Sequence, residues 1–321
     1  MTAFRRKAAV LSAVAGFLAL LVAAGVAFSP GARNARASRI RLLVPDPAEI
    51  HAVEVSGPDG SLVFRRFGAA WTLEEDGLPL PARTERIEAY LETLHSVRSL
   101  VEVSRREASW DELGLDEGSS RRIRLLLRDG ASAADFRVGR YAPDGSRVFL
   151  RKSGETRAYA APAATASRLP AGRMAWLDLR VFGEPVPRED VQRLRVSGSV
   201  RFPDGTVRRA DYVLERGLSG AWTSPQIPDL DTAAAGRLVR SWMGAEAEDF
   251  SLRMPEDREG LRVDLELGGG SLRSLRISGT PDPEGGYTAA LTGSGQYLIL
   301  DARILRDLLM TPGELSAGSR P

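Results

Sequence analysis

Cysteine is absent from this chain of 321 residues, and histidine occurs only at His51 and His95. The absence of cysteine excludes a disulfide framework, a cysteine zinc site, a thiol nucleophile and a lipidated N-terminal cysteine. Two unlinked histidines support neither a histidine-rich metal site nor a Ser-His-Asp arrangement. The sequence also lacks the G-x-S-x-G, H-E-x-x-H and P-loop motifs. Composition and motifs therefore identify no reaction.

An excess of charge of one sign is also lacking, because 44 basic and 42 acidic residues give a formal net charge of +2. Seven of the basic residues and none of the acids lie in residues 1–41, so the remaining body carries a net charge of −5. A body of that sign is a poor nucleic-acid binder. Hydrophobic residues make up 43% and charged residues 27%, which is ordinary globular composition and excludes a wholly disordered chain.

An uncharged segment of 21 residues, 8–28, follows Arg5-Arg6-Lys7. As a helix it would be roughly 31 Å long, which matches the hydrocarbon core of a bilayer. We predict an uncleaved single-pass anchor. The alternative is a signal peptide cleaved at the small-x-small pattern Ala35-Arg36-Ala37, although the apolar region of a signal usually spans only about 7–15 residues.

Basic residues are nearly balanced on the two sides of this span, so the positive-inside rule does not decide its orientation. The short tail before the span and the large body after it favour an N-terminus inside and an extracytoplasmic body on the bacterial inner membrane. Secretion after cleavage is the alternative. The basic stretch 29–41 either lies against anionic headgroups or is a solvated tether.

Two halves of the chain share seven features in the same order, at a spacing of about 141–151 residues. VEVSG at 53–57 corresponds to LRVSG at 194–198, and an alternating run ends at Trp71 in one half and at Trp222 in the other. A proline-bearing stretch, an amphipathic segment and further strand-like runs follow in each half. Pro-Asp-Gly at 58–60, 143–145 and 203–205 is a hairpin signal, and Gly268-Gly269-Gly270 is a further predicted turn.

These patterns predict an α+β fold of two tandem related lobes after one N-terminal transmembrane helix. Each lobe is expected to be a mostly antiparallel sheet with a covering helix, the first helix spanning 84–101. The predicted parts are the tail and anchor (1–28), a juxtamembrane linker (29–47), the first lobe (48–170), a junction (171–190), the second lobe (191–310) and a disordered tail (311–321).

Few side chains qualify as candidates for a site. Trp71 and Trp222 can be interpreted as a ligand platform, but their equivalent places in the two halves favour core positions. His51, at the start of the first strand, and His95, at the edge of a helix stripe, are expected to be structural or solvated.

Several acids could in principle form the carboxylate pair of a glycosidase or a weak calcium site. They are Asp111, Glu112, Asp116, Glu117, Asp229, Asp231, Glu246, Glu248, Asp249, Glu256, Asp257 and Glu259. None of them follows the ligand order of a known loop, so solvated acids on loops are the expected outcome. We predict no catalytic, cofactor-binding or metal-binding residue.

Several short segments carry a family resemblance after the strand pair that ends in Trp71. They are PARTERIEAYLETLHSV at 81–97, WDELGLDEGSSRRIRLLL at 110–127, FRVGRY at 136–141, VFLRKSGETRAYAAP at 148–162 and WLDLR at 176–180. In this order, after a single N-terminal span, the chain resembles the bacterial domain of unknown function 4340 family over about residues 45–310. The resemblance implies a membrane-anchored, extracytoplasmic accessory of ABC transport systems of the gliding-motility auxiliary type. It supplies no catalytic residue.

The sequence thus predicts a non-enzymatic, membrane-tethered accessory or scaffold subunit of an ABC-type transport or envelope complex. Its expected partners are membrane or envelope proteins, with no nucleic acid and no cofactor, and its expected docking surfaces are strand edges and the groove between the lobes. One alternative is an extracytoplasmic glycan- or peptide-binding protein that uses this groove. Another is a carboxylate-dependent glycan hydrolase, which needs two acids about 5–10 Å apart.

Overall fold

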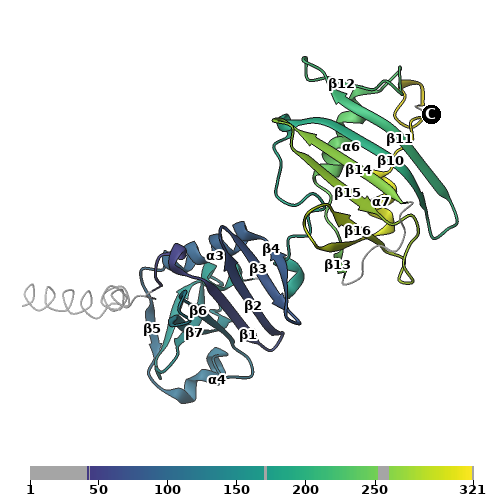
Figure 1. Ribbon diagram of the computed structural model, residues 1–321. Coiled ribbons are helices and arrows are strands. Elements are labelled where there is room, and N and C mark those ends of the chain that lie inside the picture. Colours follow the sequence, from purple (N-terminus) through teal and green to yellow (C-terminus); the bar gives the residue numbers. More distant parts are fainter. Residues whose placement is uncertain (1–41, 43, 170–171, 252–259, 320–321) are drawn as a thin grey trace, which may run out of the picture. The chain divides into compact units, whose positions relative to one another are not determined.

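The structure is a computed structural model that describes residues 42, 44–169, 172–251 and 260–319 (Figure 1). The chain divides between Leu177 and Asp178 into two compact units, which we call the first and second lobes. Each is built on an antiparallel sheet with few helices, so the predicted α+β class is confirmed. The predicted anchor at 8–28 lies outside the described residues. Among the residues that are described, no helix combines the length and apolar character needed to cross a bilayer.

The first lobe contains a nine-stranded sheet with the strand order β4-β3-β2-β1-β6-β7-β8-β9-β5. Alternating sequences put apolar side chains on one face, as in β6, where Ile123 and Leu125 are fully buried. We call this the core face and the other the open face. The strands are β1 (Ala52–Gly57), β2 (Gly60–Phe67), β3 (Ala70–Glu75), β4 (Leu78–Ala82), β5 (Val101–Ser104), β6 (Arg121–Leu126), β7 (Ser132–Tyr141), β8 (Arg147–Lys152) and β9 (Ala158–Pro162).

The second lobe contains an eight-stranded sheet with the order β12-β11-β10-β14-β15-β16-β17-β13. Apart from β4, each strand of the first sheet has a counterpart at the same place in the second, both in chain order and in the sheet. Trp71 is the second residue of β3, and Trp222 is the first residue of β12. Both are buried, as predicted, with exposed fractions of 1% and 4%. The strands are β10 (Val191–Arg201), β11 (Val207–Arg216), β12 (Trp222–Thr223), β13 (Asp249–Ser251), β14 (Leu261–Leu267), β15 (Leu272–Ile277), β16 (Tyr287–Leu291) and β17 (Tyr297–Leu300).

One helix of 12 residues packs in each lobe, α3 (Thr84–His95) in the first and α6 (Thr232–Met243) in the second (Figure 1). Helical spacing creates the apolar stripe that each helix turns inward. In α3 the buried side chains are Ile87, Tyr90, Leu91 and Leu94. In α6 the large buried side chains are Leu238, Val239 and Trp242.

The first helix is shorter than predicted, and the expected extension over 96–101 is wrong. The chain turns at Ser96, whose hydroxyl donates to the Thr93 carbonyl at 2.7 Å. It then enters β5, where Val101 pairs with Ala160 of β9. The backbone groups of this segment are therefore satisfied by a distant strand, which helical periodicity alone does not reveal.

The three Pro-Asp-Gly segments and the triple glycine lie at turns, as predicted. Each joins antiparallel neighbours: β1 to β2, β7 to β8, β10 to β11 and β14 to β15. Two of the three acids bond within the turn, since Asp144 and Asp204 accept from backbone N–H groups two residues ahead, whereas Asp59 pairs with Arg121. This Asx geometry explains why the same tripeptide recurs between strands.

The predicted disordered tail is wrong for residues 311–319. Leu315 is fully buried, and its carbonyl accepts a hydrogen bond from the Asp231 N–H at 2.8 Å. The N–H of Ala317 donates to the Asp229 carbonyl at 2.8 Å. A short helical turn, η5 (Ala317–Ser319), follows. The second lobe therefore extends beyond the predicted end at 310.

The predicted junction also belongs largely to the lobes. Trp176 packs in the first lobe against Phe64, with ring centroids 5.1 Å apart. Phe182 packs in the second lobe against Trp242, at 6.3 Å. Upstream, Leu42 and Val44 are buried, so the first lobe begins before the predicted boundary at 48. Short apolar segments outside regular elements thus seal both cores.

Candidate functional site

Trp71 is a core side chain with polar partners at its edge. Its indole Nε1 donates to Glu88 Oε1 of α3 at 2.7 Å, and its ring lies 4.7 Å from the guanidinium carbon of Arg66. Arg66 in turn pairs with Glu88 at 2.7 Å. These contacts tie β2, β3 and α3 together. The ring is too deeply buried to act as a ligand platform.

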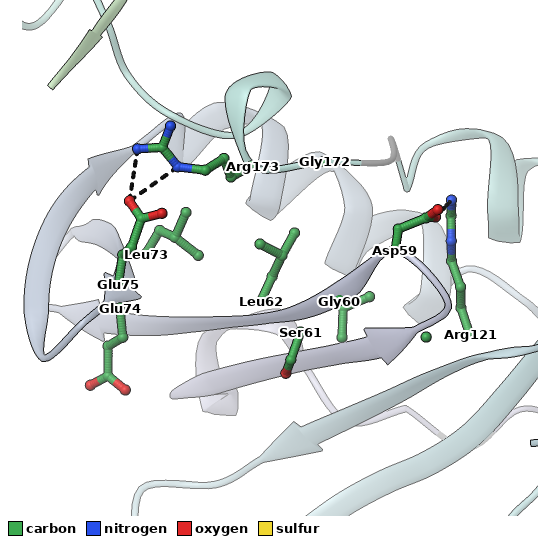
Figure 2. Close-up of a pocket in the computed structure, with 12 residues that line it drawn as sticks. Asp59, Gly60, Ser61, Leu62, Leu73, Glu74, Glu75, Arg121, Gly172 and Arg173 are labelled. Carbon is green, nitrogen blue, oxygen red and sulfur yellow. Dashed lines mark hydrogen bonds and ion pairs between the residues drawn. The ribbon is translucent and has the colours of Figure 1, made fainter. Parts of the chain in front are cut away.

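A cavity of about 270 Å³ lies in the first lobe beside the turn between β1 and β2 (Figure 2). Val55, Leu62 and Leu73 give it an apolar lining. Charged residues from four separate stretches of the chain line the rest. They are Asp59, Glu74, Glu75, Arg121 and Arg173.

Two ion pairs flank this cavity on opposite sides (Figure 2). Arg121 Nη2 donates to Asp59 Oδ2 at 2.5 Å. Arg173 donates from Nε and Nη2 to Glu75 Oε2, at 3.0 and 2.7 Å. Glu74 points away from the cavity and pairs with Arg65. Both carboxylates are engaged by arginines on opposite sides of the cavity, so they do not converge as the acid pair that glycoside hydrolysis needs, and the apolar space between them suits a small neutral or dipolar molecule.

A second polar cluster lies on the open face of the same sheet, and we call it the arginine cluster. It consists of Arg137 on β7, Arg151 on β8 and Trp110 in the short helix α4 (Trp110–Leu113). Sequence reasoning did not single these residues out, although all three lie in the segments that carry the family resemblance. Alternation places Arg137 and Arg151 on the face opposite the core, but only the strand register brings them together.

The acids considered as a catalytic pair are spread around this region without converging. Asp111 and Glu112 are exposed on α4. Glu117 accepts from Arg137 Nη2 at 3.1 Å and is 88% exposed. The arrangement is an ordinary surface ion pair, which contributes little to stability.

Asp116 organises the turn that follows α4. It accepts hydrogen bonds from the Ser119 hydroxyl and from the N–H groups of Gly118 and Ser119, at 2.9 and 3.0 Å for the latter two. The Ser119 hydroxyl is the main cause that lowers the pKa of the Asp116 carboxyl. A carboxyl held ionised in this way is poorly suited to act as a general acid.

The acids of the second lobe are likewise dispersed. Asp249 accepts from the N–H of Phe250 at 2.7 Å, and Glu246 lies in a bridge to Arg180. Glu248 is exposed, and its N–H donates to the Ile299 carbonyl at 2.7 Å. Glu256, Asp257 and Glu259 lie outside the described residues. In the part of the chain that the structure describes, no three acids or histidines are grouped so as to hold a metal ion.

Asp231 is the N-cap of α6, since its carboxylate accepts from the N–H groups of Ala233 and Ala234 at 2.9 and 3.0 Å. We expect Asp231→Ala to lower the free energy of unfolding of the second lobe by about 1 kcal/mol. Asp229→Ala, at an exposed position two residues earlier, is the matched control and should change it by less than about 0.5 kcal/mol. Equal effects in urea denaturation would contradict the capping role.

Both histidines have local structural contacts. His95 Nδ1 lies 3.0 Å from the carbonyl oxygens of Val44 and Pro45, which joins α3 to the segment that enters the lobe. His51 Nδ1 lies 3.1 Å from the Glu49 carbonyl. The structure brings neither histidine together with the acids named above.

Strand edges are less available than expected. The edge strands β5, β12 and β13 have four, two and three residues. In β4, Pro79 and Pro81 stand opposite Glu74 and Thr72 across a hairpin closed by a two-residue turn, 76–77. In such a hairpin these positions direct their backbone nitrogen toward the free edge, where proline has no N–H to donate. Edge-to-edge pairing at β4 is therefore disfavoured.

Taken together, the fold and its two polar sites define an α+β protein of two antiparallel-sheet lobes. The profile of one family, Domain of unknown function (DUF4340), matches residues 71–264, which is more than half of the chain and reaches into both lobes. The chain belongs to this family, as its sequence segments predicted. No curated protein and no solved structure matches the sequence.

Proposed function

We propose that this protein is a non-enzymatic, membrane-tethered accessory or scaffold subunit of an ABC-type transport or envelope complex, and that it works by contact. The observation that carries the proposal is the family match across both lobes, joined to an uncharged 21-residue span ahead of them. The arginine-paired carboxylates of the cavity support a binding role over hydrolysis.

A tandem duplication underlies the two lobes in this proposal. The common strand order supports it, as do the buried tryptophans at corresponding places. A duplicated body presents two related surfaces to a partner, which suits a scaffold. Among the residues that the structure describes, the second sheet has no counterpart of β4, so the two surfaces differ along that edge.

Side chains rather than strand edges are the contact groups that we propose. Phe67 is 61% exposed at the end of β2, beside the turn to β3. Leu218 is fully exposed in the corresponding turn between β11 and β12. Large apolar side chains at such tips are suited to insert into pockets of a partner, where a few anchors supply most of the binding energy.

A second candidate function is binding of a small glycan or peptide. The apolar lining and flanking ion pairs of the 270 Å³ cavity favour it. Glycan hydrolysis is the weaker alternative. Hydrolysis of an envelope glycan by the purified chain, lost when one carboxylate is changed to its amide, would establish that alternative and overturn the contact proposal.

The tether is tested by fractionating cells that express the full chain. We expect the mature protein to retain residues 8–28 and to stay with membranes after a high-salt wash. Introducing arginine at both Leu18 and Leu21 should release it, because each charge at the centre of a span costs about 2.5–3.5 kcal/mol. A soluble protein whose N-terminal sequence begins at Ser38 would show signal cleavage instead and contradict the tether.

A further inference from the structure

Three arginines lie side by side across the open face of the first sheet. Arg122 of β6 pairs in register with Arg137 of β7, and Arg137 pairs with Arg151 of β8. Side chains at paired positions project to the same face. Like charges directly opposite one another are destabilising unless something compensates them.

The three arginines have progressively fewer hydrogen-bond partners within the protein, from Arg122 to Arg151. Arg122 donates two hydrogen bonds to Asp135, at 2.9 and 2.6 Å. Arg137 donates to the Ser120 hydroxyl and to the largely exposed Glu117, both at 3.1 Å. The side chain of Arg151 makes no hydrogen bond or ion pair with any residue that the structure describes, and its Nε is buried without a hydrogen-bond partner.

The guanidinium of Arg151 is nevertheless held in place. Its central carbon lies 3.6 Å from the centroid of the Trp110 ring. The indole is itself fixed, because its Nε1 donates to the Thr156 carbonyl at 3.1 Å. Stacking on one face leaves the in-plane N–H groups of arginine unused, and these groups form the fork that recognises oxyanions.

The positive charge of Arg151 is only partly compensated inside the lobe. Burial is the main cause that lowers the pKa of Arg151, and the neighbouring charge of Arg137 adds to it, while the more distant carboxylates of Glu107 and Glu117 oppose the shift without outweighing it. A half-buried cation that lacks a carboxylate partner is a destabilising feature for the isolated fold. A fixed guanidinium fork without hydrogen-bond partners, next to a second arginine, is suited to bind an anion.

We propose that Arg137 and Arg151, with Trp110 as a supporting platform, bind an oxyanion group, either a carboxylate or a phosphate, of a ligand. The inference stands on contacts within the first lobe and does not depend on the proposed transport role. Arg151 supplies the preorganised fork, and Arg137 supplies the second charge. Ser120 and Glu117 position Arg137 until the ligand binds.

The test uses the full chain in an uncharged detergent at constant ionic strength. Inorganic phosphate and acetate are titrated separately by calorimetry, and the melting temperature is followed with each. We expect saturable binding of at least one anion and a rise in melting temperature, and the preferred probe identifies the oxyanion class. Arg151→Gln should weaken binding by about tenfold or more, the loss expected for a charge-assisted hydrogen bond.

Two further variants serve as controls for Arg151→Gln. Arg147→Gln makes the same charge change on the same strand and face, at an exposed position, and should leave binding unchanged. Arg151→Lys keeps the charge but loses the fork, so its affinity should fall between those of wild type and Arg151→Gln. Without anion, Arg151→Gln should melt no lower than wild type. The absence of saturable binding of either anion, or equal binding by Arg151→Gln, would overturn the proposal.

Discussion

Replacing Trp71 with alanine should lower the free energy of unfolding of the first lobe by about 3–5 kcal/mol. The indole is 1% exposed and fills the core between β3 and α3. Truncation leaves a cavity and removes the hydrogen bond from the indole Nε1 to Glu88. The stack of Arg66 on the ring is lost as well. The substitution therefore removes core packing, a hydrogen bond and a cation–π contact together.

Hydrogen exchange resolved by peptide, combined with urea denaturation, measures this loss in each lobe separately. Trp71→Phe should cost less, because it keeps an aromatic ring and loses mainly the hydrogen bond. Phe67→Ala, at a 61% exposed position on the same hairpin, should cost less than about 0.5 kcal/mol. Trp222→Ala should destabilise the second lobe as Trp71→Ala does the first. A small effect at either tryptophan would contradict the duplication.

The second large effect is expected at Gly139 of β7, where the turn after α4 rests directly on the sheet. A Cβ at this position would lie 2.4 Å from the Leu113 carbonyl oxygen and 2.7 Å from that of Gly114. Backbone must move to accommodate it, so Gly139→Ala should destabilise the first lobe by about 1–3 kcal/mol. The shift should also disturb the neighbouring stack of Trp110 on Arg151.

Tryptophan fluorescence and urea denaturation would measure both consequences. Gly118→Ala lies in the same connection, and its Cβ would meet only a carboxylate oxygen of Asp116 at 3.4 Å, an ordinary van der Waals distance. This control should change stability by less than about 0.5 kcal/mol. Equal effects of the two substitutions would mean that the connection does not pack on Gly139 as described.

Much of the fold could be predicted because local signals and tertiary structure agree. The alternation in 122–127 and 262–267, the helical stripe beginning at Ile87, and the recurring Pro-Asp-Gly all specify what forms. The helix end after His95 could not be predicted in the same way, since β5 is stabilised by pairing with β9 far along the chain. Leu315 shows a similar limit, because one apolar residue in a polar tail gives no periodic signal.

The two polar sites depend even more on contacts that are distant in sequence. Arg151 and Arg137 face each other only through the β7–β8 register, and Trp110 reaches them from a separate connection. In the cavity, Glu75 meets Arg173 across 98 positions of sequence. No spacing motif encodes such pairs, whereas Asp231 at the start of α6 follows a local capping pattern.

The most direct test of the contact role is to cross-link the full, affinity-tagged chain in its native cells and identify what copurifies from uncharged detergent. We predict recovery of ABC-type transporter or envelope-complex subunits, unaffected by changing His51, His95, Asp111 or Glu112 to alanine. Serine at Phe67 and Leu218 should reduce the yield, while Leu272→Ser, also at an exposed apolar position, should not. Recovery of no such subunit, or an equal yield from every variant, would contradict the account.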